Sequence, residues 1–208
     1  KSRNVVTVKL LKDIGIDYAI DYSRRLGIHS HLNRDLSIAL GSSGVSLLEI
    51  VNAYSVFANQ GYRVKPIFVT RIEDRDGNVL EEIQPEKEKV IEQTTAFIMN
   101  SMLESVVKDG TGKRVKALNR PVAGKTGTAQ KVDPATGRYS MVDHVAPFVG
   151  FVPASRPALV VLASLDTPRG FLNQGGDVAA PLFARVAQHA LRALAVPPDD
   201  TDRVLRAV

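Results

Sequence analysis

The chain of 208 residues contains no cysteine, which excludes disulfide bonds, thiol catalysis and cysteine-ligated zinc or iron–sulfur centres within it. It also lacks a long apolar run. The longest, residues 157–165, falls well short of the ~18 residues of a membrane-spanning helix and is typical of a buried strand. The four histidines are scattered: His29, His31, His144 and His189. They do not indicate a metal site.

A strong excess of one charge is absent as well. With 27 basic and 22 acidic side chains the net charge is +5, and most lysines and arginines alternate with acids, as in residues 74–76 and 86–89. This pattern indicates a solvated surface rather than the basic stripe of a nucleic-acid-binding protein. The hydrophobic fraction of 44% and the charged fraction of 24% are those of an ordinary globular chain.

Apolar residues at helical spacing predict a helix at the start of the chain. The stripe consists of Val5, Val6, Val8, Leu10, Leu11 and Ile14. We expect this helix to end at Gly15, and Asp17 to cap a second helix that stops at Gly27. No linker residues precede the first helix, so we expect the chain to be a fragment of a larger folded unit.

Three further helices are indicated. Ser46 and Glu49 have the spacing of a capping box, which begins a helix by pairing the side chain of each residue with the backbone N–H of the other. Residues 94–108 form the next helix. The last, residues 177–194, contains Pro181, which a helix tolerates in its first turn, so we expect the proline there.

Strand patterns occupy most of the remainder, namely residues 64–73, 78–83, 121–130, 145–152 and 158–166. Asp76-Gly77 joins the first two as a strong hairpin signal, and residues 85–89 are interpreted as a charged connector. Helices, a hairpin, a helix, a three-stranded meander and a final helix predict an α+β fold, with one antiparallel sheet on which helices pack. We expect residues 1–196 to form this unit and residues 197–208 to be a mobile polar tail.

The tetrapeptide Lys125-Thr126-Gly127-Thr128 lies on the first strand of the predicted meander. Lys-Thr-Gly is one of the motifs of penicillin-recognising serine enzymes. On an edge strand, the Lys125 ammonium can point into a cleft and the two threonines can present hydroxyls, while Gly127 allows close approach of a substrate. Edge N–H groups can form an oxyanion hole. Because such a triplet also arises by chance, the alternative is a solvent-facing strand end.

A second candidate motif is Ser2-Arg3-Asn4, just before the first helix. The alternative for it is an N-terminal helix cap, which serine and asparagine both favour. If the motif is catalytic, the Ser2 hydroxyl and the Lys125 amine should lie on opposite walls of one groove. A shared proton relay requires them within about 8 Å, roughly two hydrogen-bond steps.

Longer stretches around these motifs resemble the penicillin-binding protein transpeptidases. Residues 2–8, 37–49, 106–112 and 122–128 are similar to the bifunctional class A members, and residues 129–131, 144–152 and 176–181 are similar to the monofunctional class B members. The resemblance covers nearly the whole chain. It implies a serine transpeptidase fold related to the serine β-lactamases.

The family's nucleophile motif, S-x-x-K, is not found in a suitable place. Its one match, Ser105 to Lys108, falls at the predicted C-terminal end of a helix, where the dipole opposes an anionic intermediate. Ser2 does not match, since Val5 occupies the lysine position. We therefore expect the nucleophile to lie upstream, residues 1–196 to be the C-terminal part of a transpeptidase domain, and this segment alone to be inactive.

The resemblance implies a peptidoglycan D-Ala-D-Ala transpeptidase that β-lactams acylate and that needs no metal or organic cofactor. In that scheme Ser2 relays a proton, Lys125 tunes the relay and Asn4 binds the substrate amide. Thr126 and Thr128 bind the terminal carboxylate, with Gly127 between them, and the N–H of Thr128 forms half of the oxyanion hole.

The implied partners are peptidoglycan stem peptides, β-lactam antibiotics and other cell-wall synthesis proteins. The implied location is the periplasm or the outer face of the bacterial inner membrane, with a membrane-anchored parent protein. Two alternatives keep the same fold. One is a non-catalytic penicillin-binding sensor or structural homologue, and the other is a hydrolase such as a D-Ala-D-Ala carboxypeptidase.

Overall fold

The computed structural model describes residues 3–199. Its helices are α1 (Asn4–Ile14), α2 (Ile16–Arg25), the 3-10 helix η1 (Leu36–Leu40), α3 (Leu47–Ala58), α4 (Gln93–Lys108), the 3-10 helix η2 (Lys113–Leu118) and α5 (Gly175–Ala193). Its strands are β1 (Tyr62–Val64), β2 (Arg71–Glu73), β3 (Val79–Glu82), β4 (Lys87–Lys89), β5 (Ala123–Thr126), β6 (Ala129–Val132), β7 (Tyr139–Val152) and β8 (Leu159–Asp166).

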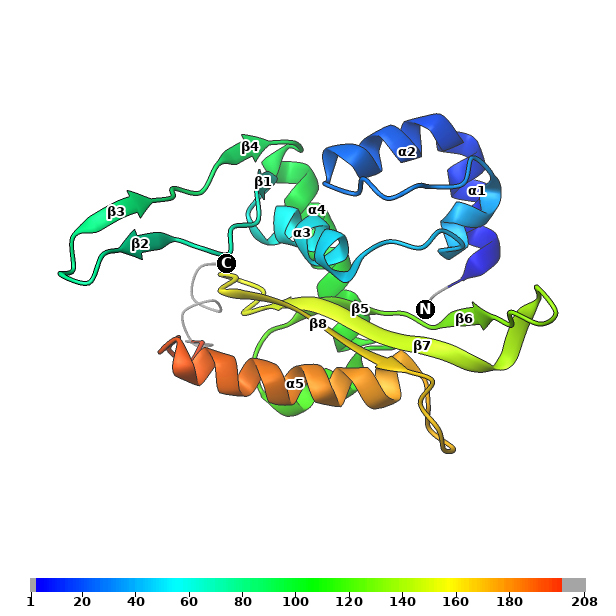
Figure 1. Cartoon of the computed structure of the whole chain (residues 1–208). Helices are drawn as coiled ribbons and strands as arrows, with labels where there is room; N and C mark the ends of the chain where they lie inside the picture. Colours follow the sequence, from blue (N-terminus) through cyan, green and yellow to red (C-terminus); the bar gives the residue numbers. More distant parts are fainter. Residues whose placement is uncertain (1–2, 200–208) are drawn as a thin grey trace.

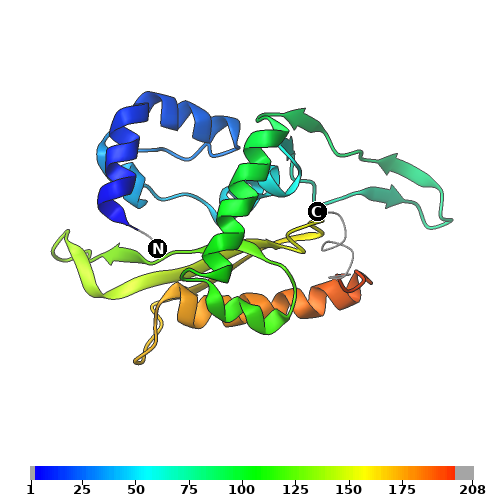
Figure 2. The same ribbon diagram turned by 180° about the vertical axis from the view of Figure 1, so that it is seen from behind.

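A sheet of four antiparallel strands organises the molecule (Figure 1). The long strand β7 pairs along one edge with β5 and β6 in succession and along the other edge with β8. Helix α5 and η2 cover one face, and α3 and α4 cover the other (Figures 1 and 2). The predicted α+β fold with helices on an antiparallel sheet is confirmed.

Two apolar clusters fill the space between these layers, because side chains alternate along β7. Phe148 and Val152 face α5, where the Phe148 ring meets that of Phe183 edge to face at 4.8 Å. Phe151 faces the opposite way, toward α3 and α4, and joins a cluster that contains Val56 and Leu103. Both faces of the sheet are therefore buried near β5.

Residues 3–46, with α1, α2 and η1, form an N-terminal lobe beside this body (Figures 1 and 2). Glu49 ties the two together. As predicted, it forms a capping box with Ser46, whose N–H donates to Glu49 Oε2 at 2.9 Å. The other carboxylate oxygen accepts the N–H groups of His29 and Ser30, both at 2.8 Å. One carboxylate thus fixes both the start of α3 and the segment of the lobe that follows α2.

Several predicted strand boundaries were wrong. The run 121–130 is two strands, β5 and β6, separated at Gly127-Thr128, and the run 145–152 extends back to Tyr139. Residues 64–73 are interrupted after Val64, near Pro66, and contribute to β1 and β2. The predicted connector includes β4, which pairs with β1. The hairpin at Asp76-Gly77 is confirmed between β2 and β3.

The first predicted helix is confirmed as α1, which ends at Gly15; of its apolar stripe only Leu11 is buried, since the helix packs mainly against α2 and η1. Two helix predictions need correction. Asp17 lies in the first turn of α2 and is not its cap, which is Gly15. Pro181 lies in the second turn of α5, because the helix begins at Gly175. Burial of the helix along its sheet-facing side offsets the lost backbone hydrogen bond.

The first residues of the predicted tail lie against the body. Arg120, just before β5, donates through Nε to Asp199 at 2.5 Å and through Nη2 to the carbonyl of Pro197 at 2.6 Å. Residues 200–208 lie outside the described part. Within residues 3–199, no helix has both the length and the apolar character needed to cross a bilayer.

Candidate active site on strand β5

Lys125 occupies the centre of β5, opposite Val149 of β7. Its side chain is half-buried, and its amine donates to the carbonyl of Thr126 at 2.7 Å. Burial lowers the pKa of the Lys125 ammonium, because removal from water disfavours the charged form. A lysine in this state can exchange a proton more readily than a solvated one.

Thr126 is joined to a residue that the sequence motifs did not single out. Its hydroxyl lies 2.7 Å from the hydroxyl of Thr111, in the loop between α4 and η2. A Cβ on Gly176, at the start of α5, would lie 2.3 Å from the carbonyl oxygen of Thr111. The signal for Thr111 was its position between Gly110 and Gly112, which permit the tight loop that delivers the hydroxyl to β5.

Gly127 follows β5 and keeps its register along β7, since its N–H donates to the carbonyl of Pro147 at 2.9 Å. A Cβ at this glycine would meet the Pro147 ring at 2.8 Å. Gly175 of α5 packs against this point, since a Cβ there would lie 2.4 Å from the carbonyl oxygens of both Gly127 and Pro147. The backbone of the motif is therefore held by close contacts that only glycines allow.

Thr128 lies between β5 and β6 and is exposed. Its hydroxyl donates to the carbonyl of Gly127 at 2.8 Å. Its N–H has no hydrogen-bond partner within residues 3–199. The four predicted motif residues thus present an amine, two hydroxyls and one unpaired N–H along a single strand end.

The structure treats the two predicted residues of the N-terminal motif differently. Asn4 is exposed and is the first residue of α1, on the N-terminal lobe; the cap of that helix is Arg3, which makes no side-chain capping hydrogen bond. Ser2 lies outside the described residues. The predicted approach of Ser2 to Lys125 therefore stays a prediction.

Ser105 lies in the last turn of α4, as predicted. Its hydroxyl donates to the carbonyl of Ser101 at 3.0 Å. This is the ordinary back-bond of a helical serine. The geometry gives Ser105 no role as a nucleophile.

Comparisons with known proteins point to one family. A family model described as the penicillin binding protein transpeptidase domain matches residues 1–188. Penicillin-binding protein 1A of Neisseria meningitidis is 36% identical over 200 residues, which cover 92% of this chain and 23% of that protein. Penicillin-binding protein 1A of Pseudomonas aeruginosa is 33% identical and covers 92% of this chain and 28% of that protein. The chain therefore spans about a quarter of the length of these relatives.

The fold has a similar counterpart among solved structures. Penicillin binding protein 3 of Mycobacterium tuberculosis, crystallised in complex with ampicillin, superposes with a TM-score of 0.82 and is 28% identical. The match covers 96% of this chain and 51% of that chain.

Proposed function

Since this chain belongs to the penicillin-binding protein transpeptidase family, we propose that it forms one wall of the active site of a peptidoglycan D-Ala-D-Ala transpeptidase. The nucleophilic serine belongs to a part of the parent protein outside this chain. The parent protein here means the longer protein of which the chain covers one portion.

The observation that carries this proposal is the arrangement at the end of β5. The half-buried amine of Lys125, the hydroxyl of Thr126 and the unpartnered N–H of Thr128 lie within four consecutive residues, and the Thr111 hydroxyl joins that of Thr126 from the loop after α4. Together they offer a tunable cation, hydroxyl donors for a carboxylate and a donor for an oxyanion. Apart from the nucleophile, these groups suit acyl transfer from a peptide with a free C-terminus.

The proposed reaction has two steps. In the first, the external serine oxygen bonds to the carbonyl carbon of the penultimate D-alanine. The peptide bond breaks, and D-alanine leaves with the serine's proton on its amine. In the second, an amine of a neighbouring stem peptide attacks the ester, the serine–carbon bond breaks, and the amine's proton returns to the serine oxygen. A β-lactam acylates the same serine by opening its ring.

In this scheme the residues of the chain bind substrate and move protons. The hydroxyls of Thr126 and Thr128 hold the terminal carboxylate, and the N–H of Thr128 stabilises the oxyanion. Ser2 passes the proton to the leaving amine, and Lys125, whose pKa burial lowers, tunes this transfer. Asn4 binds the substrate amide. Neither step needs a metal or an organic cofactor.

We place this activity outside the cytoplasm, where peptidoglycan is cross-linked. The proposed partners are stem peptides, β-lactams and other proteins of cell-wall synthesis.

The test uses the purified parent protein and a fluorescent penicillin. We expect one covalent label, which peptide mapping places on a serine outside residues 1–208, and release of D-alanine from a stem pentapeptide with formation of a cross-linked dimer. Label on Ser105 or Ser2 would refute the assignment of the nucleophile. Labelling without D-alanine release would favour a sensor, and release without dimer would favour a carboxypeptidase.

A further inference from the structure

The hydroxyls of Thr111 and Thr126 meet at 2.7 Å, although the two residues lie on different elements. The reaction scheme above assigns the terminal carboxylate to Thr126 and Thr128 and gives Thr111 no role of its own. A hydroxyl has one proton to donate, so Thr126 can give it to Thr111 or to a carboxylate, but not to both. When Thr126 donates to a substrate, its contact with Thr111 survives only if Thr111 is the donor.

The loop that carries Thr111 is fixed from two sides. The N–H groups of Gly110 and Gly112 both donate to the carbonyl of Val106 in α4, each at 3.1 Å. On the other side, the loop packs so closely against the start of α5 that a Cβ on Gly176 would lie 2.3 Å from the Thr111 carbonyl oxygen. Packed backbone therefore delivers the Thr111 hydroxyl to the end of β5.

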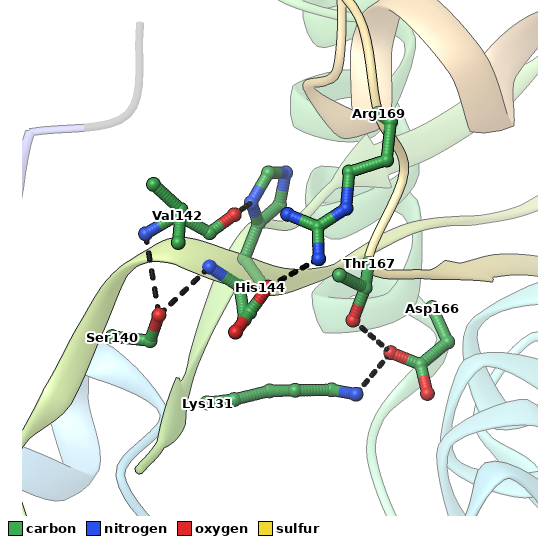
Figure 3. Close-up of polar contacts among 8 residues, drawn as sticks. Lys131, Ser140, Val142, His144, Asp166, Thr167 and Arg169 are labelled. Atoms are coloured by element: carbon green, nitrogen blue, oxygen red, sulfur yellow. Dashed lines mark hydrogen bonds and ion pairs between the residues drawn. The ribbon is translucent and has the colours of Figure 1, made fainter.

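Beyond the motif, His144 joins the start of β7 to the loop between β8 and α5, residues 167–174 (Figure 3). Its side chain is buried, and its Nε2 lies 2.8 Å from the carbonyl of Asn173. Its Nδ1 lies 3.4 Å from the carbonyl of Val142. Both ring nitrogens thus face backbone carbonyls, and neither is left to bind a substrate carboxylate.

The cations of this region are paired with acids. Figure 3 shows Lys131 directed at the Asp166 carboxylate, with which it forms an ion pair. The guanidinium of Arg169 lies 2.9 Å from the Asp143 carboxylate. Within residues 3–199, a carboxylate bound at the end of β5 therefore relies on hydroxyl and N–H donors, together with the amine of Lys125. The strength of each hydroxyl donor then matters for binding.

A hydroxyl that accepts one hydrogen bond is a stronger donor in the next, because the bonds of a chain polarise one another. The gain is larger when the final acceptor is ionised. In the order Thr111, Thr126, carboxylate, every proton points toward the negative charge. Without the Thr111 hydroxyl, Thr126 loses this polarisation, and its hydroxyl proton is free to rotate away from the substrate.

We propose that Thr111 is a positioning residue, whose hydroxyl donates to Thr126 and thereby directs the Thr126 proton at the terminal carboxylate of the donor peptide. The inference rests on the proposed function, since it takes the position of that carboxylate from it. Thr111 acts through Thr126 and does not touch the substrate. Its effect is on the preference for a donor with a free, ionised C-terminus.

The test compares two donors in the parent protein, without an acceptor peptide. One is a stem pentapeptide that ends in D-alanine, and the other is the same peptide ending in D-alaninamide. We measure kcat/KM for release of the terminal residue, at high enzyme concentration, and count active molecules by titration with fluorescent penicillin. In the unaltered protein we expect kcat/KM to be about 100-fold higher for the carboxylate, because a hydrogen bond to a charged group is the stronger one.

Thr111→Val replaces the hydroxyl by a methyl group of similar size. It should lower kcat/KM for the carboxylate donor about tenfold, mainly through KM, and change the value for the carboxamide donor less than about twofold. Thr111→Ser keeps the hydroxyl and should retain most of the preference. This pattern separates loss of the hydrogen bond from a general disturbance of the loop.

Thr95→Val is the matched control, because it makes the same change at an exposed threonine in the first turn of α4, at the opposite end of that helix from the loop. It should leave both values unaltered. If Thr111→Val lowers the two values by the same factor, or changes neither, the inference is overturned and the proposed function stands. Absence of penicillin labelling, or of any preference for the carboxylate, in the unaltered protein would instead overturn the proposed function.

Discussion

The amine of Lys125 combines partial burial with a single hydrogen bond, to the neighbouring Thr126 carbonyl. Burial of this charged amine lowers the stability of the folded state. Substitution of Lys125 should therefore lower activity without lowering stability, a combination that few substitutions in a protein core give.

We predict that Lys125→Met in the parent protein lowers the rate of penicillin acylation about 10²–10³-fold without lowering the melting temperature. Because burial lowers the pKa of the folded lysine, the unfolded chain binds more protons at pH values between that pKa and about 10.4. The free energy of unfolding should rise with pH in this window, and this rise should be absent in the variant. Acylation kinetics and calorimetry at several pH values measure both effects.

Lys116→Met, on the exposed surface of η2, is the control and should alter neither quantity. A large fall in melting temperature with unaltered acylation would assign Lys125 a structural role.

Among single residues, the sequence identified those that belong to a short motif with a fixed residue order. The Lys-Thr-Gly-Thr motif could be found as a string, and its position on a strand could be predicted, but the end of that strand at Thr126 could not. Thr111 could not, because its contact with Thr126 depends on how the loop after α4 meets β5, 15 positions away in sequence. The buried role of His144 was missed for the same reason: the sequence shows only that it is one of four scattered histidines.

Among the elements, the start of α5 makes a tight contact with Gly127, just after β5, and with Pro147 of β7. Gly175 fits there only because it lacks a Cβ, which would lie 2.4 Å from two carbonyl oxygens. The backbone at Gly127 and at Pro147 would have to move to admit a methyl group.

We predict that Gly175→Ala lowers the free energy of unfolding by about 1–3 kcal/mol, the usual range for an overpacked site, and also slows acylation. The reason is that Gly127 and Pro147 set the position of the motif. Heat-inactivation midpoints and the penicillin acylation rate of the parent protein measure the two effects. Gly44→Ala is the control: a Cβ there meets no atom within 4 Å, so it should change neither.

Strands that are defined by buried apolar residues could be predicted from the sequence. Strand boundaries that are set by hydrogen bonds could not. The core of β7 and all of β8 could be recognised by their apolar residues. The first part of β7, residues 139–144, mixes polar residues with exposed apolar ones, and it is a strand because it pairs with β6. The break between β5 and β6 lies opposite Pro147, which accepts the Gly127 N–H but has no N–H to donate in return. Periodicity does not encode this pairing of distant segments.

At the scale of the whole molecule, Glu49 connects the N-terminal lobe, which contains Asn4, to the body, which contains Lys125. The hydrogen bond from the Ser30 hydroxyl, with others from the N–H groups of Ser46 and His29, holds the pKa of the Glu49 carboxyl far below its usual value. The stabilisation is therefore complete above the unfolded pKa of about 4.3 and is lost as the pH falls below it.

We predict that Glu49→Gln lowers the heat-inactivation temperature of the parent protein at pH 7 and removes the part of its acid sensitivity that lies below about pH 4.3. Samples are heated at each pH, returned to pH 7 and assayed with fluorescent penicillin. Glu81→Gln, on exposed β3, is the control. If Glu49→Gln behaves like this control, the carboxylate does not hold the lobe to the body.

The pairing of β8 along one edge only has a practical consequence. Within residues 3–199 its other edge has no partner strand, and the sequence from Leu159 to Leu165 is apolar apart from Ser164 and free of charge and proline. Such an edge is a template for intermolecular strand pairing. When the chain is produced by itself, β8 is therefore the segment where insoluble aggregates nucleate, and a charged residue placed on its open edge is the way to keep the protein in solution.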